Sequence, residues 1–574
     1  MKILLIQPPV QDFYQTRIRT QPLGLASLAA ALREYGHGVT ILDSQCTRRK
    51  KKIPAPEKFS FIQKFYAHKD LSPFRLYTNY YHFGSSFDDI SARVREIQPD
   101  LAGIACQFTP YADMAVKTAE AVKAAVPNVT VVFGGAHASA CPETVLDCSR
   151  VDYVVLGEGE RTFARLVEKI STGGNPLTLD GVCGRQGREK VIHPVKRYIE
   201  DIDTLCFPAR DLLDPTAYKI RRKKYTMLVT SRGCPQGCSY CSVAKTMGTA
   251  FRARSPQNVI AEMIECVRNY GITAFDFEDD NFTLDPVRAE EILDRIIDVF
   301  GEKQLDLYAM NGLSVFSLTD RLLVKMKQAG FQHLDLALGS SSGKINRGMN
   351  RPDDMKRADT VFRQAADLGV PVTAYIILGI PGHRLEDMTA SITYLAAKAV
   401  RIGPSIFYPS PGTPVYADLQ RNGYALAADF SRLRSSLFPV ETNDFSRLDL
   451  VTLLRFSRWI NFVKQQIPEA VTVEALRETA LGRWHSGKTR RCRENGQDVF
   501  DLTTQDRLSA DAAGKILSAL LFAHDCFFGL RRINRGNKDL YTYRIFPYKT
   551  SQRVMKRMLH SGEDFLIRQV TAKP

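Results

Sequence analysis

Residues 225–243 read YTMLVTSRGCPQGCSYCSV, and the rest of the chain is best understood outward from this stretch. A strand-like run over 225–231 leads into a turn rich in glycine and proline that carries Cys234, Cys238 and Cys241. Cysteine thiolates are the ligands of iron–sulfur clusters, and a cubane ordinarily uses four. Three thiolates at C-x-x-x-C-x-x-C spacing therefore predict a [4Fe–4S] cluster with one iron open to another ligand.

Other interpretations of the three cysteines fit less well. A zinc site needs a fourth ligand, and no further Cys or His lies close in sequence. A redox C-x-x-C pair leaves Cys234 unused, and buried structural cysteines do not explain why all three lie on one glycine-rich turn. We therefore favour the cluster.

Downstream of the cysteines, apolar strand-like runs alternate with helical periodicity. Six consecutive strand–helix units predict a partial (β/α)6 barrel over 225–420, with its site at the carboxyl ends of the strands. The candidate strands are 225–231, 274–277, 305–309, 333–338, 372–378 and 405–408.

Upstream, residues 1–171 show the same alternation, which predicts a doubly wound, Rossmann-like sheet whose ligand lies beyond the carboxyl ends of the strands. Residues 172–224 resemble a linker with a hairpin-like stretch, and 421–574 are predicted to be mainly helical. Trp459, Trp484 and the aromatic stretch 541–548 could cover a hydrophobic substrate or lie in the core. The five N-terminal strands are predicted at 2–6, 39–43, 101–106, 129–133 and 151–156.

With these features together, the sequence resembles the radical S-adenosylmethionine (SAM) superfamily over about 225–420. FEDDNF at 277–282 resembles its second-strand motif, YIILGIPG at 375–382 its fifth-strand motif, and FYPSPGTPVY at 407–416 the stretch that closes many of these barrels. The resemblance implies that SAM occupies the open iron and is cleaved to a 5′-deoxyadenosyl radical. The resemblance implies two groups of SAM-binding residues. Those beside adenine are Tyr240, Ile376 and Leu378, and those at the amino group are Glu278, Asp279 and Asp280.

One segment departs from the family pattern. Relatives often read LALESGS after the fourth strand, with the glutamate near the SAM ribose or methionine, whereas this chain reads LALGSSS from Leu336 to Ser342. Gly339 therefore stands where that glutamate is expected, and we expect the Ser340 hydroxyl to replace it.

The N-terminal region resembles the cobalamin-binding domain that precedes many radical SAM barrels. The pieces that carry the resemblance are IQPP at 6–9, QPLGLASLAAALR at 21–33, FGGAHAS at 133–139 and VVLGEGE at 154–160. Glycines after strands let the backbone approach a large flat ligand. The cobalamin-binding residues that it implies are Pro9, Pro22, Leu23, Gly24, Gly134, Gly135, His137, Gly157, Glu158 and Gly159.

The Asp-x-His-x-x-Gly signature, which places a histidine beneath cobalt, is absent. The resemblance therefore implies cobalamin without a protein histidine on cobalt. The alternative is that His137 caps a turn and that the domain is a scaffold or a different nucleotide site.

These resemblances imply a cobalamin-dependent radical SAM enzyme of the class B methylase type, which methylates an unactivated carbon of an unidentified small-molecule or natural-product-type substrate. A cobalamin-dependent cyclase or rearrangement enzyme is the second interpretation, and a non-enzymatic cobalamin or redox sensor the third. A reductant such as flavodoxin or ferredoxin is the expected partner. No catalytic acid or base can be named from the residues.

Composition sets the remaining limits on this 574-residue chain. No apolar run approaches the roughly 20 residues that span a bilayer, and no signal peptide is evident, so we expect a cytoplasmic protein. The net charge of +16 is spread over several short basic runs. Because no nucleic-acid-binding motif accompanies them, we interpret these runs as solvated faces and do not expect nucleic acid as a partner.

Overall fold

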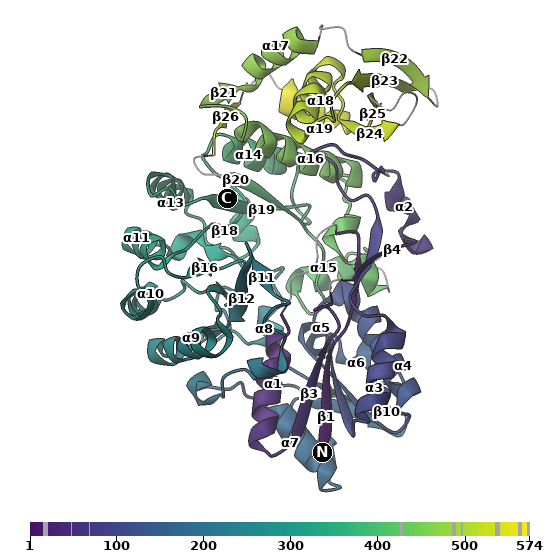
Figure 1. Cartoon of the computed structure of the whole chain (residues 1–574), viewed down its shortest axis with the longest axis vertical. Coiled ribbons are helices and arrows are strands. Elements are labelled where there is room, and N and C mark those ends of the chain that lie inside the picture. Colours follow the sequence, from purple (N-terminus) through teal and green to yellow (C-terminus); the bar gives the residue numbers. More distant parts are fainter. Residues whose placement is uncertain are drawn as a thin grey trace.

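A sheet of seven strands forms the N-terminal part of the chain, at the bottom of Figure 1. The computed structural model describes residues 1–14, 21–47, 49–67, 69–424, 429–484, 489–494, 497–533, 540–560 and 565–570, without the side chains of 480–489. The five predicted strands are present and parallel. In spatial order they are β3 (Gly38–Asp43), β1 (Lys2–Gln7), β6 (Leu101–Ala105), β7 (Thr130–Gly134) and β8 (Tyr153–Val155).

This strand order has a switch point between β1 and β6, because the chain first moves to one side of β1 and then continues on the other side. Ligands of doubly wound sheets bind at such a point, outside the carboxyl ends of the strands. The sheet continues past β8 with the antiparallel strands β9 (Val182–Gln186) and β10 (Glu189–Val191), which fall in the expected linker. The domain boundaries given above stay predictions.

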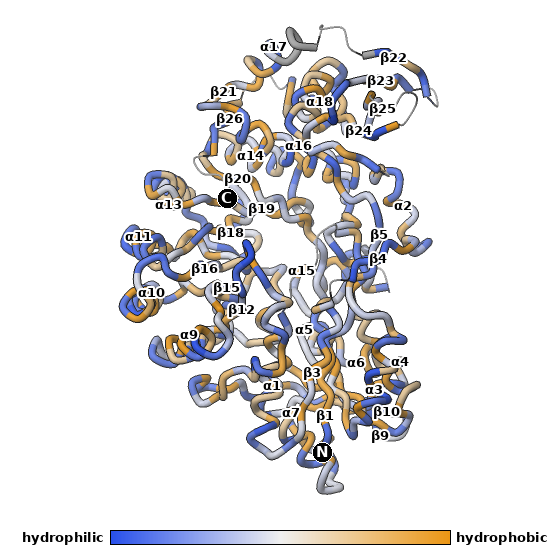
Figure 2. The backbone as a smooth tube through the Cα atoms, viewed as in Figure 1, coloured by the Kyte–Doolittle hydropathy of each residue, from blue (hydrophilic) through white to orange (hydrophobic). Residues whose placement is uncertain are grey.

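Strand β1 shows why both faces of this sheet are covered. Its alternate side chains enter two separate cores: Leu4 and Ile6 in one, Ile3 and Leu5 in the other. Figure 2 shows the central strands as apolar, as expected for a parallel sheet buried on both sides. The covering helices are α3 (Phe87–Ile97) and α4 (Ala112–Ala125) on the first face, and α1 (Leu23–Glu34) and α7 (Gly159–Ser171) on the second.

The central part is the predicted partial barrel, in two four-stranded sheets that a parallel bridge from Leu307 to Phe331 connects. The last strand begins earlier than predicted and ends at Ile406, because the prolines at 409 and 411 follow it. The six expected strands are β12 (Lys223–Leu228), β15 (Ala274–Phe277), β16 (Asp306–Tyr308), β18 (Leu334–Gly339), β19 (Val372–Leu378) and β20 (Arg401–Ile406). The outer helices are α9 (Pro256–Tyr270), α10 (Pro286–Phe300), α11 (Asp320–Ala329), α13 (Met355–Asp367) and α14 (Leu385–Ala396).

An insertion after β3 connects the N-terminal sheet to the C-terminal region. We call its segments 57–67 and 69–77 the strap. Arg455 Nη2 donates to the Phe65 carbonyl at 2.8 Å, and the Leu71 N–H donates to the Leu530 carbonyl at 2.7 Å. Apolar strap residues therefore share one continuous core with the barrel and the C-terminal helices. In sequence the strap lies between β4 (Lys50–Ile53) and β5 (Tyr80–Phe83). These two strands and β2 (Val10–Asp12) form a small antiparallel sheet with the spatial order β2, β5, β4.

The C-terminal region contains the predicted helices and also a four-stranded antiparallel sheet that the sequence did not predict. Trp459 is fully buried and belongs to the core, and the stretch 541–548 supplies a sheet strand; the Trp484 side chain lies outside the described residues. The helices are α16 (Arg447–Lys464), α17 (Val473–Trp484), α18 (Ala510–His524) and α19 (Gln552–Leu559). The strands, in spatial order, are β22 (Thr489–Glu494), β23 (Gln497–Thr504), β25 (Tyr541–Pro547) and β24 (Phe528–Ile533). None of the helices in the described part of the chain has the length and apolarity needed to cross a bilayer.

Candidate functional site

The three cysteines lie on one loop directly beyond the first barrel strand, as predicted. Gly233 opens the loop with φ +80°, and a Cβ atom there would lie 2.3 Å from the Ala250 carbonyl oxygen, so only glycine fits. The Gly233 N–H donates to Asp280 Oδ2 at 3.0 Å, and the Cys241 N–H donates to the Cys238 carbonyl at 3.0 Å. Local backbone geometry therefore holds the loop in shape.

Residues 349–350, which follow the fourth barrel strand in the chain, form hydrogen bonds to the cysteine loop. The Ser239 N–H donates to the Met349 carbonyl at 3.0 Å, and Asn350 Nδ2 donates to the Gly237 carbonyl at 3.3 Å. Asn350 adopts the left-handed backbone conformation with φ 59°, which is uncommon for a residue with a side chain.

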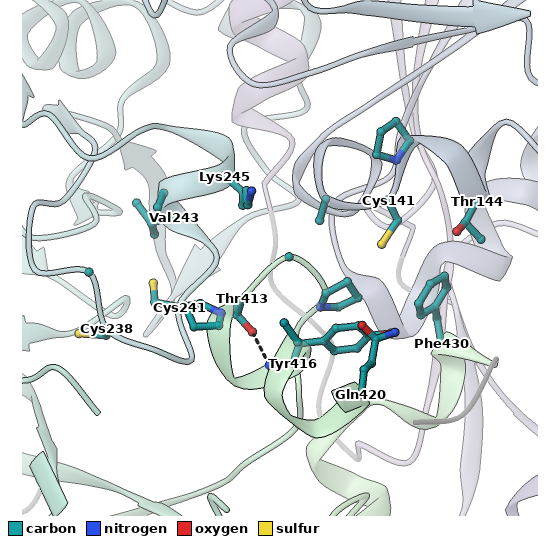
Figure 3. Close-up of a pocket in the computed structure, with 18 of the residues that line it drawn as sticks. Cys141, Thr144, Cys238, Cys241, Val243, Lys245, Thr413, Tyr416, Gln420 and Phe430 are labelled. Atoms are coloured by element: carbon teal, nitrogen blue, oxygen red, sulfur yellow. Dashed lines mark hydrogen bonds between the residues drawn. The ribbon is translucent and has the colours of Figure 1, made fainter. Parts of the chain in front are cut away.

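Cys234, Cys238 and Cys241 all face a cavity of about 900 Å³, which we call the cysteine cavity (Figure 3). Its opposite wall comes from residues 140–144 of the N-terminal part, and residues 411–417 of the barrel-closing stretch form a third side. Figure 3 shows Cys238 and Cys241 on one side of the space and Cys141, Thr144 and Phe430 on the other. The thiols thus open onto a space that both parts of the chain enclose.

The thiols suit a multi-iron cluster. Burial raises the pKa of Cys234, and it raises the pKa of Cys241 to about 11, so a cationic partner is needed to hold them as thiolates. Within the described residues, no three Cys, His, Asp or Glu side chains gather closely enough around one metal ion. In a cubane each thiolate binds a different iron, so cluster cysteines stand further apart than ligands of one ion.

The acidic residues predicted to bind the SAM amino group have three different surroundings. Glu278 lines a second cavity, and burial together with Asp276 and Asp279 raises its pKa to about 8. Asp279 is buried and accepts from the Thr230 N–H at 2.6 Å and the Ser231 hydroxyl at 2.8 Å. Asp280 holds the Gly233 N–H. The carboxylates of Asp279 and Asp280 thus shape the strand end and the cysteine loop, and their role toward SAM stays a prediction.

The other predicted SAM-binding residues are packed around the same end of the barrel. Tyr240 packs against the barrel core, and its hydroxyl accepts from Arg351 Nη1. Ser340 is buried, and its hydroxyl lies 3.2 Å from that of Ser391. Ile376 and Leu378 lie on β19 with buried side chains, and their role beside adenine stays a prediction.

A cavity of about 670 Å³ opens at the switch point of the N-terminal sheet, and we call it the switch-point cavity. Gln7, at the end of β1, and Ala105, at the end of β6, line it. Eight of the ten predicted cobalamin-binding residues do so as well: Pro22, Leu23, Gly24, Gly134, Gly135, Gly157, Glu158 and Gly159.

The glycines of this wall differ in what they do. A Cβ atom at Gly24 would meet nothing within 4 Å, and one at Gly134 would meet only the Val155 carbonyl oxygen at 3.7 Å. These two residues leave open space that a ligand can fill. Gly135 instead has φ +110°, and a Cβ atom there would lie 3.0 Å from the Cys106 carbonyl oxygen, so it is required by the backbone. A large ligand therefore fits against Gly24 and Gly134.

Two predicted cobalamin-binding residues lie outside the wall of the switch-point cavity. Pro9 is buried near Gly84. The His137 ring packs edge-on against Phe430 at 4.8 Å between centroids, and Nδ1 lies 3.1 Å from the Thr109 hydroxyl. Burial lowers the pKa of His137 to about 4, so the ring is neutral.

Glu158 lines the cavity but also joins the two parts of the chain. Its carboxylate accepts from Arg232 Nη1 at 2.9 Å, Arg252 Nη1 at 2.8 Å and the Ile199 N–H at 2.7 Å. Arg232 lies two residues before Cys234 and also contacts Glu160. A buried ion network therefore connects the wall of the switch-point cavity to the base of the cysteine loop.

The sequence did not predict that residues of the N-terminal part line the cysteine cavity, or that residues of the barrel line the switch-point cavity. Residues 140–144, which follow β7, reach the cysteine cavity, and Met227, Val229 and Arg232 of the barrel reach the switch-point cavity. The position of Val229 and Arg232 just beyond the carboxyl end of β12 was the available signal, since ligands of such barrels bind there.

Comparisons with known proteins agree with this arrangement. Residues 76–167 match the B12 binding domain family, and residues 228–395 match the radical SAM superfamily. The chain therefore combines a B12 binding domain with a radical SAM domain. An uncharacterized methyltransferase of Pyrococcus horikoshii is 28% identical over 79% of this chain and 91% of its own length. The cytidylyl-2-hydroxyethylphosphonate methyltransferase of Streptomyces wedmorensis is also 28% identical, over 74% of this chain and 82% of its own.

A solved structure also shares the fold of this chain. The radical SAM methyltransferase TsrM of Kitasatospora setae, with tryptophan and a SAM analogue bound, superimposes with a TM-score of 0.57 at 16% identity. The match covers 79% of this chain and 88% of that one. The cofactors that the two matched domains and these comparisons indicate are the [4Fe–4S] cluster, SAM and cobalamin. In this chain Cys234, Cys238 and Cys241 would hold the cluster, and the wall of the switch-point cavity would hold cobalamin.

Proposed function

We propose that this protein methylates an unactivated carbon of a small, natural-product-type molecule that binds in the cysteine cavity. The observation that carries the proposal is the composition of that cavity, because the cysteine loop and residues 140–144 of the cobalamin-type sheet face the same space. A carbon radical must meet its methyl donor within about 3–3.5 Å. Because both parts of the chain enclose the cysteine cavity, we expect a substrate bound there to lie between the cluster and the methyl donor.

The cofactors supply the hard chemistry, a hydrogen-abstracting radical and a transferable methyl group. The chain's own residues position the substrate and exclude water. Val243, Pro411 and Phe430 give the cavity apolar surface, which protects a radical from side reactions. Lys245, Tyr416 and Gln420 offer the polar groups that can orient a substrate.

The proposal includes the setting of the reaction. The cluster needs an electron for each SAM cleavage, so we expect a reductant such as flavodoxin or ferredoxin and a reducing, cytoplasmic location. Oxygen-free purification should yield about four irons per chain.

Anaerobic turnover with methyl-labelled SAM tests the function. Lysates and fractions of natural-product, lipid and peptide candidates supply the substrates. A methylase forms S-adenosylhomocysteine and 5′-deoxyadenosine together and transfers the label to the product. If SAM and a substrate are both consumed and the label does not enter the product, the proposal is contradicted.

A second function deserves the same experiment. Anaerobic magnesium-protoporphyrin IX monomethyl ester cyclases are among the relatives of this chain, so a cobalamin-dependent cyclisation or rearrangement is the alternative. Product formation that needs cobalamin and leaves the SAM methyl group untransferred favours it.

A further inference from the structure

The cysteine loop stands on a short two-stranded ladder. Strand β13 (Ser231–Arg232) leads into Cys234, and β14 (Arg252–Ala253) follows the loop and pairs antiparallel with β13. In this register Arg232 lies directly opposite Arg252. Like charges directly opposite each other destabilise an antiparallel pair of strands. The base of the loop therefore needs a negative charge between the two arginines.

The N-terminal part of the chain supplies that charge. One oxygen of the Glu158 carboxylate, Oε1, accepts from Arg232 Nη1 at 2.9 Å and from Arg252 Nη1 at 2.8 Å. Arg232 Nη2 also donates to Glu160 Oε1 at 2.6 Å. In the described part of the chain, all ion pairs of these two arginines are to Glu158 and Glu160. Among the described residues, Glu158 is thus the acid that bridges both cations.

The bridge is buried. The side chains of Glu158 and Arg252 are 3% and 9% exposed, and that of Arg232 is 13% exposed. Water and salt screen buried charges only weakly, so the repulsion between the two arginines is large unless the carboxylate lies between them. Removal of one partner of a buried ion pair is strongly destabilising, because the other charge stays buried.

The N-terminal sheet fixes where this carboxylate lies. Gly157 precedes Glu158 with φ +65°, and its N–H donates to the Ser139 hydroxyl at 2.9 Å. A Cβ atom at Gly157 would lie 3.1 Å from Val195 Cγ2 and 3.4 Å from the Thr246 carbonyl oxygen. The glycine therefore lets this segment approach residues 233–251, which the ladder encloses. The acid reaches the loop from the other part of the chain because that part folds against it.

We propose that Glu158 is a positioning residue for the cluster, which acts through Arg232 and Arg252. Its carboxylate holds the base of the cysteine loop together and cancels one positive charge close to the cluster. The resemblance described above implies a role toward cobalamin instead, and the two roles lead to different experimental outcomes. The proposal requires that the cluster binds to the three cysteines, and it does not depend on which reaction follows.

Iron release tests the positioning role. Wild type, Glu158→Gln and Glu168→Gln are loaded with iron and sulfide without oxygen, and the loss of iron to a chelator is followed over time. We expect Glu158→Gln to lose iron about tenfold faster, the change that coupling between charged groups in contact predicts. Cobalamin absorbance in the same samples should stay unchanged. Glu168→Gln should behave as wild type, because Glu168 is exposed on the helix that follows Glu158.

A second substitution separates the loss of charge neutralisation from a general loss of packing. In the double variant Glu158→Gln/Arg252→Gln the repulsion is absent, and Arg232 keeps its ion pair with Glu160. We expect the double variant to release iron more slowly than Glu158→Gln, although the single variant differs from wild type at fewer positions. If Glu158→Gln does not fold, the soluble yield of the two variants gives the same comparison.

The reduction potential of the cluster gives a readout that a loss of packing would not move in a fixed order. The net charge around an iron–sulfur cluster sets its potential, and added positive charge raises it. Glu158→Gln removes a negative charge and should raise the midpoint potential, whereas Arg252→Gln should lower it. The double variant has the net charge of wild type and should lie between them. Redox titration followed by electron paramagnetic resonance of the reduced cluster measures this order.

Each outcome decides the role of Glu158. Faster iron release in Glu158→Gln, its recovery in the double variant and the expected order of potentials support the proposal. Unchanged iron release, a double variant no better than the single one, or potentials in another order overturn it. Loss of cobalamin with an unchanged cluster also overturns it and assigns Glu158 to cobalamin. Absence of methyl transfer by the wild type, with the expected cluster behaviour, rejects the proposed function alone.

Discussion

The cysteine cavity and the switch-point cavity both open beyond the carboxyl ends of parallel strands, but they are assembled differently. The ligands of the cysteine cavity come from eight consecutive residues, 234–241, on one locally closed loop. The wall of the switch-point cavity comes from the loops after several strands that are more than a hundred residues apart. A cluster site of this kind is encoded locally, whereas a cobalamin site of this kind depends on the whole sheet.

The largest expected effect tests the local site. Replacing Cys234, Cys238 or Cys241 with Ala should remove nearly all of the roughly four irons per chain and abolish SAM cleavage. Iron and sulfide analysis of anaerobically purified protein measures the first effect, and 5′-deoxyadenosine formation the second.

Cys141 provides the matched control, because it faces the same cavity from the opposite wall. Cys141→Ala should keep the cluster, as should the Ala variants of Cys106, Cys266 and Cys526. An iron-replete protein without Cys234, Cys238 and Cys241 would refute the local origin of the site.

The second-largest expected effect is a loss of cobalamin from the switch-point cavity, whose wall several distant loops form. Gly24→Leu and Gly134→Leu place a side chain in open space within the switch-point cavity, so bound cobalamin should fall about tenfold or more, as overpacking by about 1–3 kcal/mol predicts. The iron content should not change. Cobalamin absorbance after gel filtration reports the loss.

Gly38→Leu is the control for that experiment, since Gly38 lies in the same sheet at an open position outside the cavity wall. Gly135→Leu is a poor test by comparison, because the backbone itself needs glycine there. Wild-type cobalamin content in both Gly24→Leu and Gly134→Leu would mean that cobalamin binds elsewhere.

A smaller effect concerns Glu278, whose pKa of about 8 is far above the ordinary 4.5. A carboxyl with a raised folded-state pKa favours the folded state below its unfolded pKa, and this contribution is lost as pH rises through the folded value. Between pH 5 and pH 8.5 the wild-type Tm should therefore fall more than that of Glu278→Gln, by a few degrees. Glu291→Gln, a surface variant on α10, should follow wild type. Parallel Tm curves for wild type and Glu278→Gln would contradict the raised pKa.

The smallest expected effect is none at all. Because His137 faces Phe430 and Thr109 instead of the switch-point cavity, His137→Ala should leave the electron paramagnetic resonance spectrum of bound Co(II) cobalamin unchanged. Neither protein should show nitrogen hyperfine splitting from a protein imidazole. Splitting that disappears in the variant would place His137 on cobalt after all.

The same contrast explains what could be predicted from the sequence. Apolar runs such as 2–6 and 372–378 identify buried parallel strands, and the cysteine spacing identifies the cluster ligands without any tertiary information. Strand β22 reads TRRCRE, and its charges conceal a largely exposed antiparallel strand. Arg351 belongs to no periodic pattern, and its contacts with Gly339 and Tyr240 are seen only in the folded structure.

The strap has a consequence for how this protein is made. Phe65 and its partner Arg455 are 390 residues apart in sequence, so a ribosome adding 5–20 residues per second needs about 20–80 s to deliver the second after the first. During that time the two cores of the N-terminal sheet can already form and the strap can contact Phe13 and Tyr80, while its partners in the C-terminal region are still missing. The apolar surface that the strap buries against the C-terminal region therefore stays exposed until the synthesis of the chain is nearly complete.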